Sequence, residues 1–137
     1  MADTIRKVDY FKMEASNKVG EGARLLNALR EDGVNLLAFT GFPKGRRAQI
    51  DFIPENTAAF KMAAKRAGMK VGLKKTGFLV QGDDRVGAVA DVVTRLADAK
   101  INVTAMDALS AGNGRWGAIL WVKSTDVAKA ARALKAS

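Results

Sequence analysis

The chain has 137 residues, of which 48% are hydrophobic and 27% are charged, and its formal net charge at pH 7 is +9. It contains no cysteine and no histidine, which excludes disulfides, thiolate chemistry and the most common general base and metal ligand. No apolar run has the length of a membrane span and the start lacks the features of a secretion signal, so we expect a soluble, cytoplasmic protein. Because common metal ligands and a full nucleotide-binding glycine motif are missing, we expect no metal and no organic cofactor.

The first half of the chain begins with a strand and a helix. Alternating apolar residues predict the strand over Val8–Ala15, and the polar, glycine-containing segment Ser16–Gly20 is typical of a turn. In the helix that follows, Leu25 and Leu29 lie one turn apart on an apolar face. Gly33 suits the end of this helix because glycine readily adopts the left-handed conformation found there.

A hairpin, a second helix and a short strand complete the first half. The hairpin joins Leu36–Phe42 to Arg47–Ile53 across a turn that contains proline and glycine. The second helix is capped by Asn56 or Thr57 and runs to Ala67. The last predicted element of this half is the strand Met69–Leu73.

The second half repeats the first when Asn35 is laid over Asn102. The repeat predicts a strand over Thr76–Gln81, a turn over Gly82–Gly87 and a helix over Asp126–Lys135. No counterpart of the last strand follows that helix, so we expect a sheet edge that is open or is completed by another chain. The aligned landmarks include Phe11 with Phe78, Gly20 with Gly87, Leu26 with Val93, Leu29 with Leu96 and Phe60 with Val127.

This order of elements predicts an α+β protein made of two ferredoxin-like βαββαβ units, each an antiparallel sheet with its helices on one face. We expect the first domain at residues 6–74 and the second at residues 75–136. The basic excess is shared by both halves, and most lysines and arginines fall on the solvated faces of predicted helices.

The second half resembles the ACT domain, a family of regulatory modules that bind amino acids. The resemblance rests on Gly82–Ala90, an acidic-Arg-Val-Gly turn that opens a helix, and on Ala99–Val103, which ends in Ile-Asn-Val. The first half repeats the motif more loosely over Asn17–Gly22 and Gly33–Leu36. Both copies depart from the family in having valine, at positions 19 and 86, where proline is usual.

The resemblance implies an amino acid or related metabolite bound at the strand–helix turn, usually where two such domains pack side by side, in an allosteric regulator. There a glycine lets the backbone approach a ligand, and the first N–H groups of the helix suit a carboxylate. Asp83 or Asp84 would accept from the ammonium group, and Arg85 would pair with an acidic group. The candidate ligand-binding residues are Asn17, Lys18, Val19, Gly20, Glu21, Asp83, Asp84, Arg85, Val86 and Gly87, with Asn35 and Asn102 as second choices.

Several of these candidates also have a purely structural interpretation. Aspartate is a preferred residue at helix N-caps, and we favour that role for Asp84. Gly20 and Gly87 fit a tight turn whether or not a ligand binds. For Asn35 and Asn102 we favour hydrogen bonds to the local backbone at a turn.

The sequence also bears on partners. The segment Trp116–Val122 is apolar on both alternating faces, so we expect its second face to be covered and predict a homodimer, in addition to a regulated partner protein. The basic hairpin residues Lys44, Arg46 and Arg47 make nucleic-acid binding the alternative function. We disfavour it because the strands lack the aromatic signature of RNA-binding domains. No catalytic constellation is present, so we expect no enzyme activity.

Overall fold

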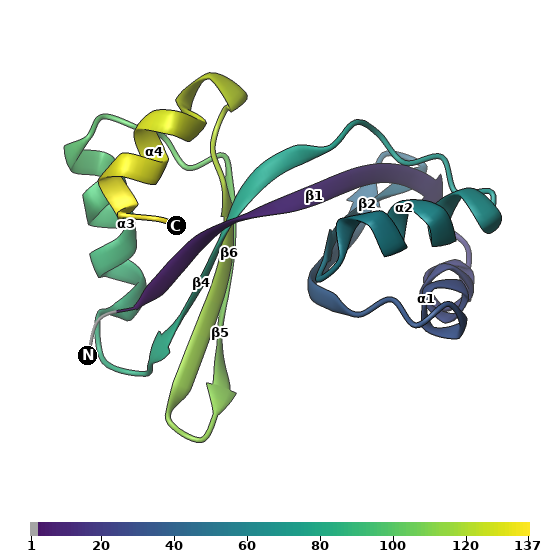
Figure 1. Ribbon diagram of the computed structural model, residues 1–137, viewed down its shortest axis with the longest axis horizontal. Coiled ribbons are helices and arrows are strands. Elements are labelled where there is room, and N and C mark those ends of the chain that lie inside the picture. The colour runs from purple at the N-terminus through teal and green to yellow at the C-terminus, as the bar shows by residue number, and fades with distance from the viewer. Residues whose placement is uncertain (1–2) are drawn as a thin grey trace. The chain divides into compact units, whose positions relative to one another are not determined.

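The computed structural model describes residues 3–137, which form an α+β fold of six strands and four α-helices (Figure 1). Hydrogen-bonded strands follow the order β2-β3-β1-β4-β6-β5. The elements are β1 (Thr4–Ser16), α1 (Glu21–Glu31), β2 (Leu36–Lys44), β3 (Arg47–Pro54), α2 (Thr57–Arg66), β4 (Lys75–Asp83), α3 (Ala88–Asp98), β5 (Ala105–Gly112), β6 (Arg115–Trp121), the 3-10 turn η1 (Ser124–Asp126) and α4 (Val127–Leu134).

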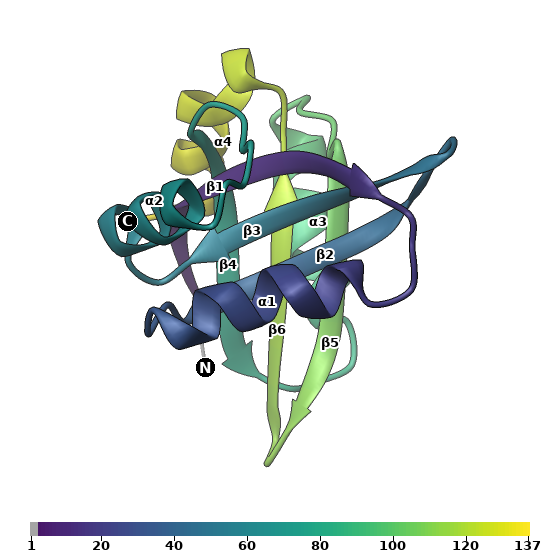
Figure 2. The ribbon, with the colours of Figure 1, turned by 90° about the vertical axis from the view of Figure 1, so that its right-hand side faces the viewer.

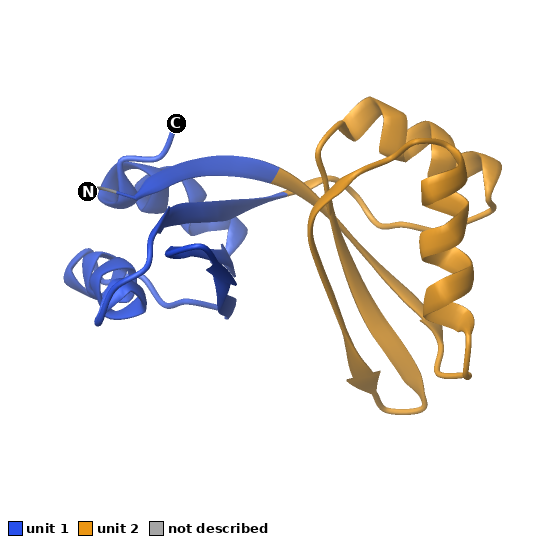
Figure 3. Ribbon diagram, turned by 90° about the horizontal axis from the view of Figure 1, so that it is seen from below, with its two compact units in different colours: residues 1–8, 76–137 blue, residues 9–75 orange. Residues whose placement is uncertain are grey.

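The chain forms two compact units, coloured separately in Figure 3. Unit 2 consists of Asp9–Lys75, and unit 1 consists of Thr76–Ser137 together with the residues up to Val8. The boundary therefore lies inside β1, whose first half belongs to unit 1 and whose second half belongs to unit 2. Residues 6–8, which we expected in the first domain, lie with the second half of the chain.

Unit 2 has an antiparallel sheet with α1 and α2 on one face (Figure 2). Its core is aromatic: Phe11 and Phe52 are opposite each other on β1 and β3, and the rings of Phe11 and Phe60 stack with centroids 5.0 Å apart. The predicted hairpin is confirmed. The predicted cap of α2 is also confirmed, because the Asn56 Oδ1 atom accepts a hydrogen bond of 2.9 Å from the amide of Ala59.

Unit 1 repeats this arrangement, with α3 and α4 on one side of its sheet (Figure 1). Phe78 on β4 is opposite Leu120 on β6, and both are fully buried against the apolar face of α3, which carries Val92 and Leu96. Periodic apolar residues thus produce a second core of the same design. The predicted ferredoxin-like repeat is confirmed.

The repeat extends to the way in which α1 and α3 end. The amide of Val34 donates to the carbonyl of Leu29 at 3.0 Å, and the amide of Ile101 donates to the carbonyl of Leu96 at 2.9 Å. Both helix ends thus use the left-handed C-terminal motif that the sequence predicted for the first helix. The residues with positive φ are Gly33 at 72° and, unusually for a residue with a side chain, Lys100 at 63°.

The prediction of a strand over Met69–Leu73 is wrong. Met69 follows α2 and takes part in its C-terminal cap, because its amide donates back to the carbonyl of Ala64 at 2.8 Å. Farther along, the amide of Gly72 donates to the carbonyl of Lys12 at 2.8 Å, but residues 69–74 form no regular ladder. The helix cap uses the residues that would have begun the strand.

The expectation of an open or externally completed edge beside β4 is also wrong. The first half of β1 belongs to unit 1 and is the hydrogen-bonded neighbour of β4, so the same chain supplies the fourth strand. On the other side of this segment, Ser137 exchanges backbone hydrogen bonds of 3.0 Å with Ile5 and Lys7. The internal repeat did not predict this fourth strand, because the first half of β1 lies far earlier in the sequence than the rest of unit 1.

Both faces of β6 are buried within the single chain. Trp116 and Leu120 lie in the core of unit 1, and Ile119 and Trp121 on the alternate face are only 5% and 6% exposed. The expectation of a covered second face is confirmed. A partner subunit is not needed to explain the composition of this strand.

Candidate functional site

The turn between β4 and α3 carries the motif that the sequence singled out. The carbonyl of Arg85 accepts from the amide of Ala88 at 3.3 Å, which closes the turn immediately before the helix. Gly87 is the N-cap, with φ at 84°, and its carbonyl accepts the first helical bond from Asp91 at 2.9 Å. The N-cap role that we favoured for Asp84 is wrong, because three residues of turn separate it from the helix.

The turn of unit 2, between β1 and α1, has the same geometry. Gly20 is the N-cap with φ at 89°, and the amide of Glu21 donates to the carbonyl of Lys18 at 3.2 Å. Arg24 donates to the carboxylate of Glu21 at 2.7 Å and lowers the pKa of that carboxyl. The remaining candidates of this turn are Asn17 and the fully exposed Val19.

Both N-cap glycines are explained by their backbone conformation. A Cβ atom added to Gly20 or Gly87 would meet no atom within 4 Å, so no close neighbour requires the absence of a side chain. Their positive φ does require it, since residues with a Cβ rarely adopt that conformation. The open space also leaves the backbone of each turn accessible, with Val19 and Val86 fully exposed beside it.

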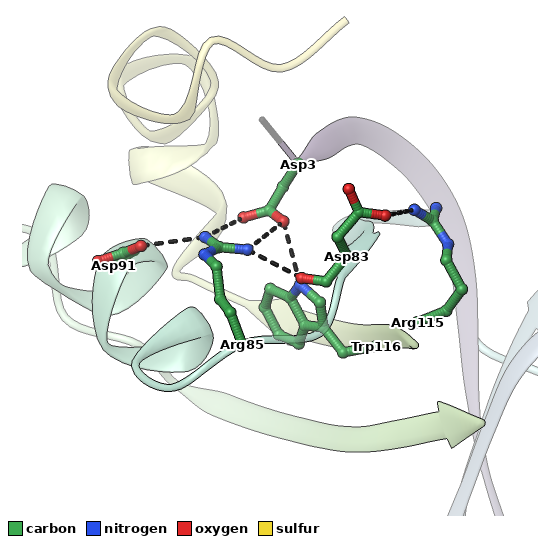
Figure 4. A network of polar contacts seen from close by, with 6 residues as sticks. All are labelled: Asp3, Asp83, Arg85, Asp91, Arg115 and Trp116. Carbon is green, nitrogen blue, oxygen red and sulfur yellow. Dashed lines mark hydrogen bonds and ion pairs between the residues drawn. The ribbon is translucent and has the colours of Figure 1, made fainter. Parts of the chain in front are cut away.

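A polar network extends from Arg85 across the end of β4 (Figure 4). The guanidinium donates to both oxygens of the Asp3 carboxylate, at 3.0 and 3.1 Å, and to Asp91 at 3.0 Å. The indole Nε1 of Trp116 also donates to Asp3, at 3.0 Å, and the Asp3 side chain is only 1% exposed. The carboxylate partners of Arg85 are therefore side chains of the same chain.

The network changes the protonation behaviour of its members. The hydrogen bonds from Arg85, and to a smaller extent from Trp116, lower the pKa of Asp3 despite the opposing effect of burial. Asp3 and Asp91 together raise the pKa of Arg85, so its charge is permanent. At the outer edge of the network, Arg115 donates to the carboxylate of Asp83 at 2.8 Å, and both side chains are half exposed.

A pocket of about 270 Å³ lies in unit 1 between the start of α3 and strand β5. Asp84 and Arg85 line its polar side, and Val89, Leu109 and the edge of Trp116 line its apolar side. Asp84 uses its backbone amide for a hydrogen bond of 2.8 Å to the carbonyl of Gly114. The pocket therefore combines a carboxylate with apolar walls, directly beside the first amides of a helix.

The two asparagines lie away from these turns. Asn102 follows the C-terminus of α3, whose 11 residues separate it from Gly87 by about 16 Å, at 1.5 Å per residue. It lines a separate hollow with Val93 and Lys100. Asn35 follows α1 in the same way and donates to Glu55 at 3.4 Å. The structure thus brings neither asparagine to the strand–helix turns at Gly20 and Gly87.

Comparison with known proteins identifies the domain that contains the pocket. The sequence model of the ACT domain matches residues 78–136, which include the turn, α3, β5, β6 and α4. Residues 78–136 are therefore similar to the ACT domain family. Unit 2 repeats the order of elements of this ACT domain, as a tandem arrangement requires.

Solved structures share the fold of the whole chain at low sequence identity. Protein BT0572 from Bacteroides thetaiotaomicron is 17% identical, with a TM-score of 0.78 over 97% of this chain and 88% of that one. The ligand-free regulatory subunit of aspartate kinase from Thermus thermophilus is 15% identical, with a TM-score of 0.63 over 98% and 95%. The corresponding subunit from Thermus flavus is 17% identical, with a TM-score of 0.59 over 98% and 94%. No curated protein matches the sequence.

Within the described residues 3–137, none of the helices is long and apolar enough to cross a membrane. Likewise, that part of the chain contains no cluster of three acidic, histidine or cysteine side chains able to hold a metal ion.

Sequence reasoning missed several residues that build the ACT domain site. Asp3, immediately before β1, pairs with Arg85, and Trp116 on β6 donates to Asp3. Leu109 lines the pocket from β5. Asp3 is separated from Arg85 by 82 positions along the chain. Asp91 was the only one with a local signal, since it lies six residues after Arg85, on the first turn of the helix.

Proposed function

We propose that this protein is a non-enzymatic regulator that binds an amino acid at the β4–α3 turn of its ACT domain. The observation that supports this proposal most strongly is the pocket beside Gly87, where a free carboxylate, helix amides and apolar walls meet. The amides of Val89 and Ala90 lie in the first turn of α3, where backbone N–H groups have no partner within the helix. They would receive the ligand's carboxylate, which the helix dipole also favours.

The charges around the pocket favour a neutral ligand side chain. Arg85 already donates to Asp3, to Asp91 and to the carbonyl of Asp83, so it has little capacity left for an acidic side chain. Asp84 is the carboxylate that remains to accept from the ammonium group. Val89 and Leu109, which are 41% and 64% exposed, would gain apolar contacts from the ligand. We therefore propose an amino acid with an apolar side chain.

A thermal-shift comparison tests this proposal. Apolar amino acids such as leucine and valine are compared with aspartate and glutamate, and a ligand at one hundred times its dissociation constant adds about 2.7 kcal/mol of stability. Asp84→Asn removes the charge that holds the ammonium group and should abolish the shift. Asp107→Asn, a matched change on the exposed strand β5, should leave it intact. The proposal fails if no amino acid stabilises the wild type, or if Asp84→Asn responds as the wild type does.

We also propose that the protein forms a homodimer through β5, and that dimer assembly or a partner protein reads the ligand. β5 is the last strand of the sheet, so one of its edges has no partner strand within residues 3–137, and Leu109 on it is 64% exposed. Unpaired edges with apolar side chains favour association with another chain.

Sedimentation velocity tests the dimer. We expect twice the chain mass of 14.6 kDa for the wild type and a monomer for Leu109→Lys. Met62→Lys, which changes a similarly exposed residue on α2, should remain dimeric. A monomeric mass for the wild type at micromolar concentrations contradicts the proposal.

A further inference from the structure

The carboxylate of Asp3 is bound as a small ligand would be bound. Its side chain is 1% exposed, and three N–H groups converge on its two oxygens. Arg85 donates from Nη1 to Oδ1 at 3.0 Å and from Nη2 to Oδ2 at 3.1 Å, which is the bidentate fork that recognises carboxylates. Trp116 Nε1 adds the third bond, to Oδ1 at 3.0 Å. Exposed ion pairs at protein surfaces lack both this burial and the third donor.

Gly82 provides the space that Asp3 occupies. A Cβ atom at Gly82 would overlap Oδ1 of Asp3 and lie 3.0 Å from its Cγ. Gly82 is directly opposite Trp116, and β4 is the strand between β1 and β6. The missing side chain therefore also lets the indole reach across β4 to Asp3 (Figure 4). Glycine within a strand often marks such a close approach.

Unit 2 shows that this arrangement is not a general property of the fold. Its pair of residues at the place of Gly82 and Trp116 is Ala15 opposite Ala48, and Lys18 occupies the position of Arg85. The side chain of Ala15 fills the space that Gly82 leaves open. Ala48 has no side-chain N–H to replace the indole, and Lys18 cannot form the bidentate pair that a guanidinium forms. The open space at Gly82, the indole donor of Trp116 and the guanidinium of Arg85 occur together in unit 1.

We propose that Arg85, Trp116 and Gly82 form a carboxylate-binding niche in unit 1 and that Asp3, immediately before β1, is its resident ligand. An external carboxylate reaches the fork of Arg85 only when Asp3 leaves it, so the two compete for the same donors. Release of Asp3 also frees one end of the segment that pairs with Ser137 through Ile5 and Lys7. The niche does not depend on the proposed amino-acid site, which uses Asp84 and the amides of α3.

Rescue of a vacated niche by formate tests this proposal. Asp3→Ala removes the resident carboxylate and leaves space for a formate ion, so its melting temperature should fall and should recover by at least half, saturably, in sodium formate. The reference is sodium chloride at equal ionic strength. The wild type should not respond to formate beyond chloride, because Asp3 holds the donors. If Asp3→Ala is unfolded in chloride, regain of its far-ultraviolet circular dichroism in formate is the same readout.

Matched variants identify the donors and the need for empty space. Asp3→Asn keeps the side-chain volume and should not respond to formate, and Asp3→Ala with Arg85→Met should lose the response. Asp91→Ala removes the other carboxylate on Arg85 but leaves Asp3 in place, so it should show no rescue. The proposal is overturned if formate and chloride affect Asp3→Ala equally, or if formate stabilises Asp91→Ala or the wild type as much as it stabilises Asp3→Ala. Binding of amino acids is measured separately through Asp84→Asn, so failure of one proposal leaves the other intact.

Discussion

Replacing Gly82 by alanine should expel the Asp3 carboxylate from its contacts with Arg85 and Trp116. The added methyl group would overlap Oδ1 of Asp3, and it would lie 3.2 Å from the Asp3 Cα atom, so the backbone beside it has little room to yield. The cheapest adjustment is rotation of the Asp3 side chain into solvent. The other residues of β4 keep their positions in the ladder with β6.

The expected cost follows from the bonds that Asp3 loses. A hydrogen bond to a charged group contributes about 1.5–3 kcal/mol, but the released carboxylate and the partly exposed guanidinium regain water, so we expect a loss of about 2.5 kcal/mol in total. The methyl group restricts the unfolded chain and offsets about 0.5 kcal/mol of this loss. The remaining loss of about 2 kcal/mol lowers the melting temperature by about 8 °C in a chain of this size.

A double-mutant cycle shows whether Asp3 is the cause. Urea and thermal unfolding, followed by circular dichroism, are measured for Gly82→Ala, Asp3→Ala and the double variant. With Asp3 already truncated the methyl group has no carboxylate to displace, so the second substitution should stabilise the protein by about 0.5 kcal/mol. The coupling energy should therefore be about 2.5 kcal/mol. Equal losses from Gly82→Ala in both backgrounds would refute the reasoning.

The remaining predictions concern pH and two local backbone features. The pKa of Asp3 in the folded state is below its ordinary value of 3.8. The stability that the wild type gains over Asp3→Asn should therefore be constant above about pH 5 and should disappear as the pH falls through that lowered pKa. Urea unfolding at several pH values measures this difference. Gly22→Ala lies within α1, where a Cβ meets no atom within 4 Å, so it should raise stability by about 0.5–1 kcal/mol; a loss would indicate a neighbour that the structure does not contain. Asn56→Ala removes the cap of α2 and should cost about 1 kcal/mol in chemical unfolding, whereas Asn56→Asp should retain most of that stability.

The candidate site was predictable only in its local part. The turn at Gly87 could be located because a polar segment containing glycine stands between a strand pattern and a helix pattern. The N-cap was assigned to Asp84 instead, since residue preference does not reveal how many turn residues precede the first helical bond. The pairing of Arg85 with Asp3 had no local signal, because the two residues approach only when β1 is placed beside β4.

Periodicity and the internal repeat were sufficient to predict the helices, the hairpin and the ferredoxin-like class, because apolar spacing is a local consequence of which face of a helix or strand is buried. Folding alone determined that the first half of β1 completes unit 1 and that the carboxylate of Asp3, immediately before β1, is buried against a guanidinium and an indole. A strand edge has no sequence signature for its partner, since backbone hydrogen bonds are the same for every residue pair. The packing of the whole chain therefore determines that β1 pairs with the edge of β4, and this pairing brings Asp3 to Arg85 at the turn before α3.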